Sequence, residues 1–317
     1  MIEVNHLKKE FKIPVQKKGR FSAVRNLFSS EHTIKRAVDD ITFSVGDGEI
    51  VGFIGKNGAG KSTTMNIMTG CLAATEGEVT VGGYDIFEDA AQAKRRIGYL
   101  PERPPLYLDR TPLEYLAFVG QAKGLTGSAL EEQMRRVMAV TQIESVSNRL
   151  IKNLSKGYQQ RVGIAQALLG DPEVVILDEP TVGLDPLQII EIRELILKLN
   201  REQGITFLIS SHILDELARL ATHYGFLDAG RMVREMSVEA LEAQCRKCIR
   251  VEVSDIRALA RLWSVWRGIR EVAENLAEKM QTETNTLLCL STGDRAVRAL
   301  ASEINAQLQA LRRFRPF

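Results

Sequence analysis

The sequence predicts an α/β fold with a parallel sheet, and two observations support this prediction. Short apolar runs of strand length alternate with amphipathic runs of helix length along most of the 317 residues, and this alternation is typical of parallel α/β sheets. In addition, the glycine-rich segment Gly55–Ser62 follows a strand-like run and precedes a helix-like run. The order strand, glycine loop, helix is the context in which such loops bind phosphate.

Composition and charge limit the class of protein. The chain is 44% hydrophobic and 26% charged, which suits one large or two ordinary domains, and its net charge of +2 does not indicate nucleic acid. No apolar run approaches the ~18 residues of a membrane span, and the first residues lack a signal-peptide pattern. The four scattered cysteines fit a reducing cytosol, and the lone C-x-x-C at Cys245–Cys248 favours incidental surface thiols over a metal or redox site.

Two predicted strands and a basic stretch precede the glycine loop. Residues 1–7 predict an edge strand, which Phe11 follows, and residues 37–45 alternate like a second strand. Between them, residues 12–36 hold seven Lys or Arg and one acid, with apolar side chains at helical spacing, namely Phe21, Val24, Leu27 and Phe28. This basic insert is either a short amphipathic helix that touches a membrane surface or a membrane partner, or a solvated arm packed on its own domain.

The other elements of the first 236 residues alternate between strand and helix. Further strands are predicted at 49–54, 77–82, 97–100, 173–179, 205–210, 224–227 and 231–233. Helices are predicted at 63–69, from Leu154–Tyr158 to Leu169, at 186–200 and at 213–220, with an exposed helical segment at 111–147.

The character of the sequence changes near residue 237, where we place a domain boundary. Helices are predicted at 238–244, 255–266 and 294–308, and strands at 247–253, 269–272 and 286–290. This order predicts a small α+β domain of the split βαβ type. It carries no motif to which we assign chemistry.

The glycine-rich loop carries the strongest chemical signal. Gly55–Ser62 matches G-x-x-x-x-G-K-[ST] in full and is followed by Thr63. Its glycines let successive backbone N–H groups point at one anion, and the helix N-terminus adds partial positive charge. Lys61 reaches the outer phosphates, and the Ser62 hydroxyl ligates Mg²⁺. The loop therefore predicts a nucleoside triphosphate; a plain glycine-rich turn with a solvated lysine is the weaker interpretation.

Two carboxylates and a histidine follow predicted strands. Asp178 and Glu179 end an apolar run, at the sheet edge where parallel sheets bind ligands. Asp178 suits the Mg²⁺ shell together with Ser62, and Glu179 suits the attacking water as general base. His212 ends another apolar strand and is placed to contact the γ-phosphate or the water, although a single histidine is more often structural.

A second anion site is predicted at Leu154–Tyr158. Ser155, Gly157 and backbone N–H groups open a helix there. Alone, this is only a helix cap. Two phosphate-binding edges with one phosphate loop, however, indicate two copies that share nucleotides across an interface.

Together these motifs resemble the ATP-binding subunit of an ABC transporter, over residues ~1–235 and in the family's order. The phosphate loop matches Walker A, and Val174–Glu179 matches Walker B with its catalytic glutamate. Leu154–Arg161 resembles the LSGGQ signature, Gly183–Asp185 the D-loop and His212 the switch histidine. Phe11 stands where the family places an aromatic residue that stacks on adenine.

The sequence departs from the family pattern at three places. Glu102, in Tyr99–Glu102, replaces the usual Q-loop glutamine, as is familiar from the ABC-2-type export branch, so the resemblance implies a carboxylate near Mg²⁺. Lys156 and Tyr158 replace Gly and Gln of the signature, again as in that branch. The basic insert separates Phe11 from the next strand.

The resemblance implies a P-loop NTPase domain with a mixed sheet over residues 1–236, a helical subdomain at about 103–170, and the small α+β accessory domain at 237–317. It implies Mg²⁺-dependent ATP hydrolysis with Glu179, His212 and Glu102 as catalytic residues. The implied Mg²⁺ ligands are Ser62, Asp178 and Glu102. The implied nucleotide-binding residues are Phe11, Gly55, Lys56, Asn57, Gly58, Ala59, Gly60, Lys61, Ser62, Thr63, Ser155, Gly157 and Asp185.

The resemblance also implies partners and a location. Two nucleotide-binding domains, identical or paralogous, would sandwich two ATP molecules and pull on a separate integral-membrane permease from the cytoplasmic face of the inner membrane. No nucleic acid is expected. The alternative is a soluble ABC ATPase acting on ribosomes or DNA, but such chains usually carry two cassettes, a coiled coil or zinc modules. A simple P-loop GTPase or kinase would leave Leu154–Arg161 and Asp185 without a role.

Overall fold

The computed structural model describes residues 1–14, 32–245, 248–251 and 288–291. The chain divides into two compact units, Met1–Val238 and Glu239–Phe317. In the second unit, the described strands β11 (Cys248–Val251) and β12 (Leu288–Ser291) pair in antiparallel fashion. The elements predicted at 255–266, 269–272 and 294–308 lie outside the described residues.

The described strands of the first unit form two sheets. The larger sheet has the order β10-β9-β3-β8-β7-β6. All neighbours in it are parallel except the hairpin β9–β10, so the predicted α/β fold with a mixed sheet is confirmed. Every residue of β7 and β8 is buried, which explains their unbroken apolar runs. The bounds are β3 Ile50–Ile54, β6 Ile97–Leu100, β7 Val174–Asp178, β8 Thr206–Ser211, β9 His223–Asp228 and β10 Arg231–Ser237.

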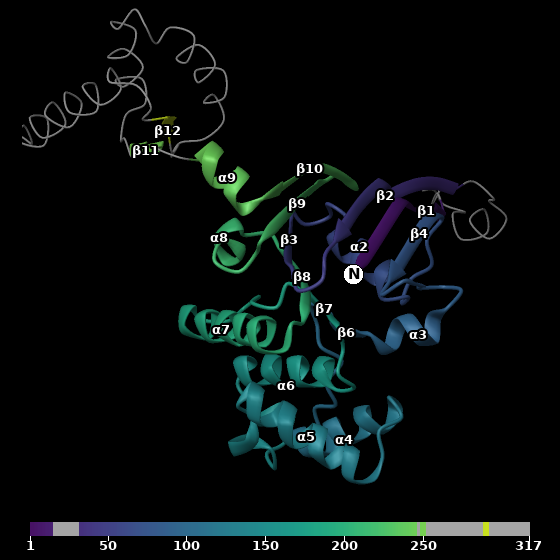
Figure 1. Cartoon of the computed structure of the whole chain (residues 1–317), viewed down its shortest axis with the longest axis vertical. Coiled ribbons are helices and arrows are strands. Elements are labelled where there is room, and N and C mark those ends of the chain that lie inside the picture. The colour runs from purple at the N-terminus through teal and green to yellow at the C-terminus, as the bar shows by residue number, and fades with distance from the viewer. Residues whose placement is uncertain (15–31, 246–247, 252–287, 292–317) are drawn as a thin grey trace, which may run out of the picture. The chain divides into compact units, whose positions relative to one another are not determined.

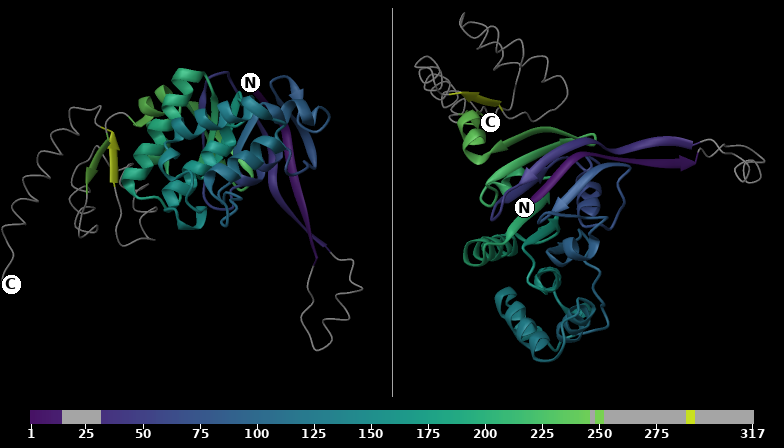
Figure 2. Two further views of the ribbon diagram at one scale, coloured as in Figure 1. Left: turned by 90° about the horizontal axis from the view of Figure 1, so that it is seen from below. Right: turned by 45° about the vertical axis from the view of Figure 1, so that its right-hand side comes forward.

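The smaller sheet is antiparallel and corrects two expectations. Its order is β2-β1-β4-β5, with β1 Ile2–Pro14, β2 His32–Val45, β4 Glu76–Val81 and β5 Tyr84–Asp85. The predicted edge strand at 1–7 is wrong in place and length, because β1 lies between β2 and β4 and continues to Pro14. The two ends of the basic insert are therefore strand, and Figure 2 shows β1 and β2 side by side as a long ribbon. The helical spacing at Phe21–Phe28 lies outside the described residues.

Helices cover the larger sheet and also form a separate layer. In the first unit they are α2 Lys61–Met68, α3 Ala90–Arg95, α4 Pro112–Ala122, α5 Gly127–Thr141, α6 Lys156–Leu168, α7 Pro186–Gln203 and α8 Leu214–Leu217. A further helix, α9 Val238–Cys245, falls almost wholly in the second unit. The single helical segment expected at 111–147 is instead α4, α5 and the short 3₁₀ helix η1 (Glu144–Val146). The Thr111–Glu114 capping box starts α4, and left-handed Gly124 follows its end.

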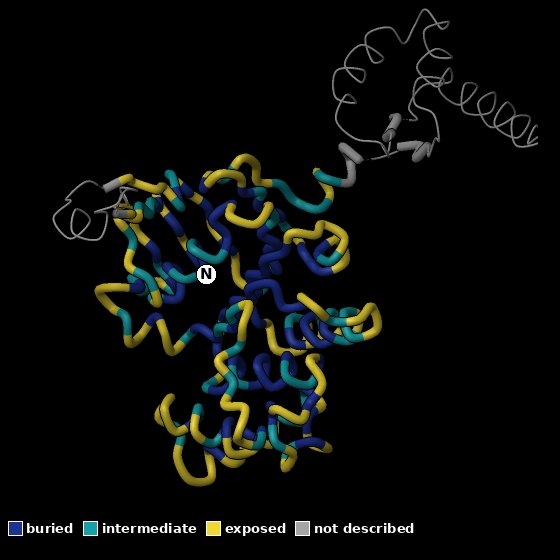
Figure 3. Tube along the Cα trace, turned by 180° about the vertical axis from the view of Figure 1, so that it is seen from behind, coloured by how far each residue is buried: buried dark blue, intermediate teal, exposed yellow. Residues whose placement is uncertain are grey.

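The helix that follows the phosphate loop, α2, packs into the hydrophobic core. Met65, Ile67 and Met68 of α2 are fully buried in one cluster with residues of both sheets, such as Val79 and Ile176. Helices α4, α5 and α6 pack on one another, and α6 also packs on β6, as Figure 1 shows. Buried residues follow the central strands, whereas exposed ones cover the outer helices (Figure 3). In the described part of the chain, every helix is too short or too polar to cross a membrane.

Candidate active site

The phosphate loop connects β3 to α2 and passes very close to neighbouring backbone. Gly60 has a φ of +106°, and a Cβ there would lie 2.7 Å from the Ala37 carbonyl oxygen. A Cβ at Gly55 would clash with the Leu227 carbonyl oxygen. Glycine is therefore needed at both positions. The loop is also tied to the β9–β10 turn, because the Gly230 N–H donates to the Ala59 carbonyl at 2.9 Å.

Lys61 and Glu179 form a buried ion pair at this loop. Their side chains are 5% and 7% exposed, and Lys61 Nζ lies 3.3 Å from Glu179 Oε1. Lys61 Nζ also donates to the Gly55 carbonyl at 2.6 Å. Among the described residues, Glu179 Oε1 accepts no hydrogen bond. Each charge therefore depends on the other, since an unpaired buried charge is strongly unfavourable.

The end of β8 holds Glu179 in place. Asp178 of β7 is in register with Ser210 of β8. The Ser210 hydroxyl donates to Asp178 Oδ1 at 2.5 Å and accepts from the Glu179 N–H at 2.9 Å. Glu179 itself has a left-handed φ of +49°, a conformation that non-glycine residues adopt where surrounding contacts impose it. His212 Nδ1 lies 2.8 Å from Glu179 Oε2, so two neighbouring strand ends bring the predicted base and histidine together.

A cavity of about 750 Å³ collects most of the predicted site residues. It is lined by Phe11, Lys56 to Thr63, Glu102, Glu179 and His212. It is also lined by residues that sequence reasoning missed, which are Lys12, Ile13, Lys35, Arg36, Ala37 and Val182. The cavity thus places cations and carboxylates around the phosphate loop.

The β1–β2 ribbon supplies the outer wall of this cavity. Phe11 is 37% exposed and pairs across the ribbon with Lys35. Lys9 Nζ lies 5.2 Å from the centre of the Phe11 ring. The missed residue Lys35 is 24 positions from Phe11 in sequence, and only the register of the ribbon brings the two together.

Five predicted residues do not line this cavity, and one of them, Gly55, directly precedes the lining residue Lys56. Asp178 is 2% exposed and is held by Ser210. Ser155 caps α6, and Asp185 caps α7 by accepting from the Gln188 N–H at 2.9 Å. A Cβ at Gly157 would meet the Gln188 side chain at 2.7 Å, so the signature-like segment lies against the start of α7.

The cavity fits a magnesium nucleotide rather than a metal cage. Within the described residues, no group of three or more His, Cys, Asp or Glu is arranged to hold a metal ion. Ser62, Glu102 and Glu179 nevertheless bring oxygen-bearing side chains to the cavity. Mg²⁺ is typically bound by one or two protein oxygens together with substrate phosphates, so this sparse oxygen set is suitable.

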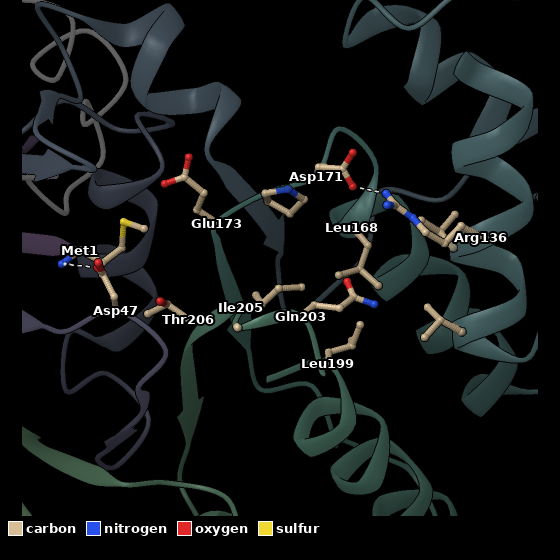
Figure 4. Close-up of a pocket in the computed structure, with 14 residues that line it drawn as sticks. Met1, Asp47, Arg136, Leu168, Asp171, Glu173, Leu199, Gln203, Ile205 and Thr206 are labelled. Atoms are coloured by element: carbon tan, nitrogen blue, oxygen red, sulfur yellow. Dashed lines mark hydrogen bonds and ion pairs between the residues drawn. The ribbon is translucent and has the colours of Figure 1, made fainter. Parts of the chain in front are cut away.

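A second cavity, of about 650 Å³, lies at the opposite sheet edge, where β7 and β8 begin (Figure 4). Its charged groups are paired: Arg136 with Asp171, Glu173 with Arg96, and the N-terminal ammonium of Met1 with Asp47 at 3.2 Å. Its lining among the described residues includes neither the phosphate loop nor any other glycine-rich turn. The first cavity is therefore the candidate active site.

Comparison with known proteins identifies the family. Residues 38–182 match the sequence profile of the ABC transporter family. The bacitracin transport ATP-binding protein BcrA of Bacillus licheniformis is 37% identical over 222 residues, which are 70% of this chain and 71% of BcrA. The chain belongs to the ABC transporter ATP-binding proteins.

Other ABC proteins agree with this assignment. The linearmycin resistance ATP-binding protein LnrL of Bacillus subtilis (strain 168) is 38% identical over 199 residues, which are 63% of this chain and 64% of LnrL. The structure of the ATP-binding cassette MJ0796, dimeric and bound to ADP and Pi, matches with a TM-score of 0.63 and 27% identity over 75% of this chain and 99% of that one. The predicted P-loop NTPase fold of an ABC ATPase is thereby confirmed.

Proposed function

We propose that the protein hydrolyses ATP with Mg²⁺ and drives export by a separate ABC-2-type permease. The observation that carries this proposal is the meeting of Lys61, Glu179 and His212 beside the phosphate loop. The names of BcrA and LnrL, which refer to bacitracin transport and linearmycin resistance, support antibiotic export as the context.

ATP binding begins at the glycine loop. Its backbone N–H groups and the N-terminus of α2 receive the phosphates, and the Phe11 ring stacks on adenine. Lys61 lies 3.3 Å from Glu179 and, on our proposal, turns to the outer phosphates when they arrive. This exchange of partners releases Glu179 as a base at the moment when the substrate is in place.

Ser62 and Glu102, which line the cavity, would hold Mg²⁺, and Asp178, which lies beneath the cavity bonded to Ser210, would complete the set through its second carboxylate oxygen. Mg²⁺ would supply positive charge to the phosphate oxygens when bound. Hydrogen bonds from the neighbouring strands also hold the backbone of Glu179 in position. Asp178 orients the Ser210 hydroxyl, and that hydroxyl holds the Glu179 backbone N–H. These bonds fix the base relative to the sheet, which hydrolysis requires because a displaced base loses the attacking water.

Hydrolysis is then a single displacement. Glu179 accepts a proton from water while the water oxygen bonds to the γ-phosphorus, and the bond to the bridging oxygen breaks so that ADP leaves with the electron pair. His212 Nδ1, 2.8 Å from Glu179 Oε2, orients the base and contacts the γ-phosphate.

A second copy completes the site. Ser155, Gly157 and Asp185 do not line the cavity of their own chain, so we propose that they close over the nucleotide of the partner. The partner is an identical chain or a paralogue. Residues 1–236 act as the ATP-binding domain, with the helical subdomain at 103–170, and residues 237–317 act as an accessory domain.

An exposed apolar patch provides a docking surface for the permease. Four large side chains that follow the Glu102 loop are 40–52% exposed, namely Tyr107, Leu108, Leu113 and Phe118. The ring centres of Tyr107 and Phe118 lie 5.3 Å apart, with the ring planes tilted by 43°. We propose that this patch binds the permease at the cytoplasmic face of the membrane, where the protein is peripheral. We also propose that Glu102 couples the presence of ATP or ADP in the cavity to the position of this patch.

The variant Glu179→Gln tests the proposal. The amide keeps the size of the side chain but is a poor base, so ATP should bind and close the dimer while hydrolysis stops. With the permease, ATP and Mg²⁺ present, light scattering should show the variant held as an ATP-bound dimer while wild type reopens as ATP is spent.

Glu132→Gln, at an exposed position of α5, is the matched control and should behave as wild type. Wild-type hydrolysis by Glu179→Gln would refute Glu179 as the base. A variant that binds ATP and stays open would refute the sandwich.

A further inference from the structure

Glu216 lies where two segments of the active site meet. The Thr181 hydroxyl donates to Glu216 Oε2 at 2.8 Å, and the Ser211 hydroxyl donates to the same oxygen at 2.7 Å. Thr181 opens the loop that runs to Asp185, and Ser211 is the residue before His212. One carboxylate oxygen therefore joins two segments that are 30 positions apart in sequence (211 − 181).

This junction is firmly anchored. Thr181 is 6% exposed and Ser211 1% exposed. The helix that carries Glu216 is fixed by Leu217, which is 1% exposed. A Cβ at Gly52, in the strand that enters the phosphate loop, would lie 2.9 Å from Leu217 Cδ1. Hydrogen bonds from two hydroxyls to an ionised carboxylate are stronger than bonds between neutral groups, so Glu216 holds both segments tightly.

We infer that Glu216 is a positioning residue that couples the loop 181–185 to His212. On the His212 side, Ser211 Oγ accepts the Ile213 N–H at 3.0 Å and so sets the backbone on both sides of the histidine. On the loop side, the Leu184 N–H donates to the Thr181 carbonyl at 3.1 Å, which fixes the turn before Asp185.

This inference rests on the proposed function, in which Asp185 faces the partner copy. Closure of the partner then moves the loop 181–185, and Glu216 transmits that movement to His212 and through it to Glu179. The site would thus reach its hydrolytic geometry only when the partner is in place.

The first experiment compares Glu216→Ala with Glu216→Gln in the full chain. Glu216→Ala should lower kcat for ATP by about ten- to a hundredfold, as expected for lost bonds to a charged group, with KM changed less than about twofold. Glu216→Gln should retain kcat within about threefold, because its amide oxygen still accepts both hydroxyls. Asp215→Asn, exposed on the same helix, is the control and should match wild type.

The second experiment asks whether Glu216 acts through His212. In a double-mutant cycle, Glu216→Ala should lower kcat little further in a His212→Ala background. An equal further loss there would overturn the inference, and so would wild-type kcat in Glu216→Ala.

Two more variants keep the inference testable if Glu216→Ala does not fold. Thr181→Val and Ser211→Ala each remove one hydroxyl, and each should lower kcat while the amount of nucleotide bound per chain stays constant. Wild-type kcat in both would overturn the inference. Glu179→Gln separates the two hypotheses: if it is inactive while all of these variants match wild type, only the role of Glu216 fails, and if it is fully active, the proposed function fails.

Discussion

Three single residues contact Glu179, the proposed base. Lys61 neutralises one carboxylate oxygen and His212 contacts the other, while Ser210 holds the backbone. The same carboxylate is thus both an ion-pair partner and the proposed base. On our proposal these two functions exclude each other, and the position of Lys61 decides between them.

Replacing Lys61 by alanine tests the first of these functions. Lys61→Ala should abolish ATPase activity and weaken ATP binding, because the outer phosphates lose their cation. It should also lower the free energy of unfolding by roughly 3–5 kcal/mol, since Glu179 stays buried without its partner. Phosphate release, binding of a fluorescent nucleotide and chemical denaturation measure the three effects.

Two matched variants sharpen this test. Adding Glu179→Gln to Lys61→Ala should restore part of the lost stability, because the unpaired charge is gone. Lys198→Ala, exposed on α7, is the control. Wild-type turnover in Lys61→Ala would remove the basis for the Walker A assignment.

A variant of Glu102 tests the role of the carboxylate that replaces the family's Q-loop glutamine. It lines the cavity, so Glu102→Ala should impair hydrolysis or its coupling to the permease more than it impairs nucleotide binding. ATPase and transport assays in vesicles that contain the permease measure this, with Glu132→Ala as control. Unchanged ATPase and transport rates would make Glu102 an ordinary loop carboxylate.

Among the elements, the strands that are buried on both faces are the ones that the sequence predicts best. The predictions at 173–179 and 205–210 match β7 and β8, because strands buried on both faces leave an unbroken apolar run. Glu179 and His212 were predictable for the same reason, since each follows such a run. The length of the β1–β2 ribbon was not predictable, because exposed basic residues hide the alternation of apolar and polar side chains along its strands.

Contacts that depend on tertiary structure were also missed. Ser210 and Glu216 lie in ordinary sequence contexts, and only the pairing of β7 with β8 and the position of α8 give them partners. Lys35 reaches the cavity only through the ribbon register. Such roles require the fold first, whereas the phosphate loop carries its chemistry in a contiguous motif.

The contact between β2 and the hairpin β9–β10 gives a pH-dependent prediction. Arg231 donates to Asp39 Oδ2 at 2.6 and 2.8 Å. These hydrogen bonds hold the pKa of Asp39 below its usual value of 3.8. A lowered pKa in the folded state means that the stabilisation is complete above the unfolded value and is lost as the pH falls through the lower folded value.

Asp39→Asn should therefore lower Tm at neutral pH, and the difference from wild type should shrink below about pH 4. Thermal unfolding followed by circular dichroism between neutral and acid pH measures this. Asp89→Asn, at an exposed position, is the control. A difference that persists unchanged at the lowest pH would show that packing, not charge, is responsible.

For the whole molecule, every described residue that lines the cavity lies in the first unit. A chain that ends at Val238 also keeps the bond from the Val238 N–H to the Thr222 carbonyl, at 3.0 Å. We predict that this truncated chain binds ATP as the full chain does, measured by fluorescence titration beside circular dichroism. A folded truncated chain without ATP binding would mean that the second unit contributes to the site.

The strand order of the larger sheet also affects how the protein is made. The phosphate-loop strand β3 lies between β8 and β9, and its first residue, Ile50, pairs with Phe207. During synthesis on the ribosome, β3 therefore has neither of its partner strands, β8 and β9, until almost the whole first unit has emerged. An apolar strand without partners is prone to wrong pairing, and such non-local sheets fold slowly. We therefore expect the newborn chain to gain its nucleotide site late, after most of the first unit has been synthesised.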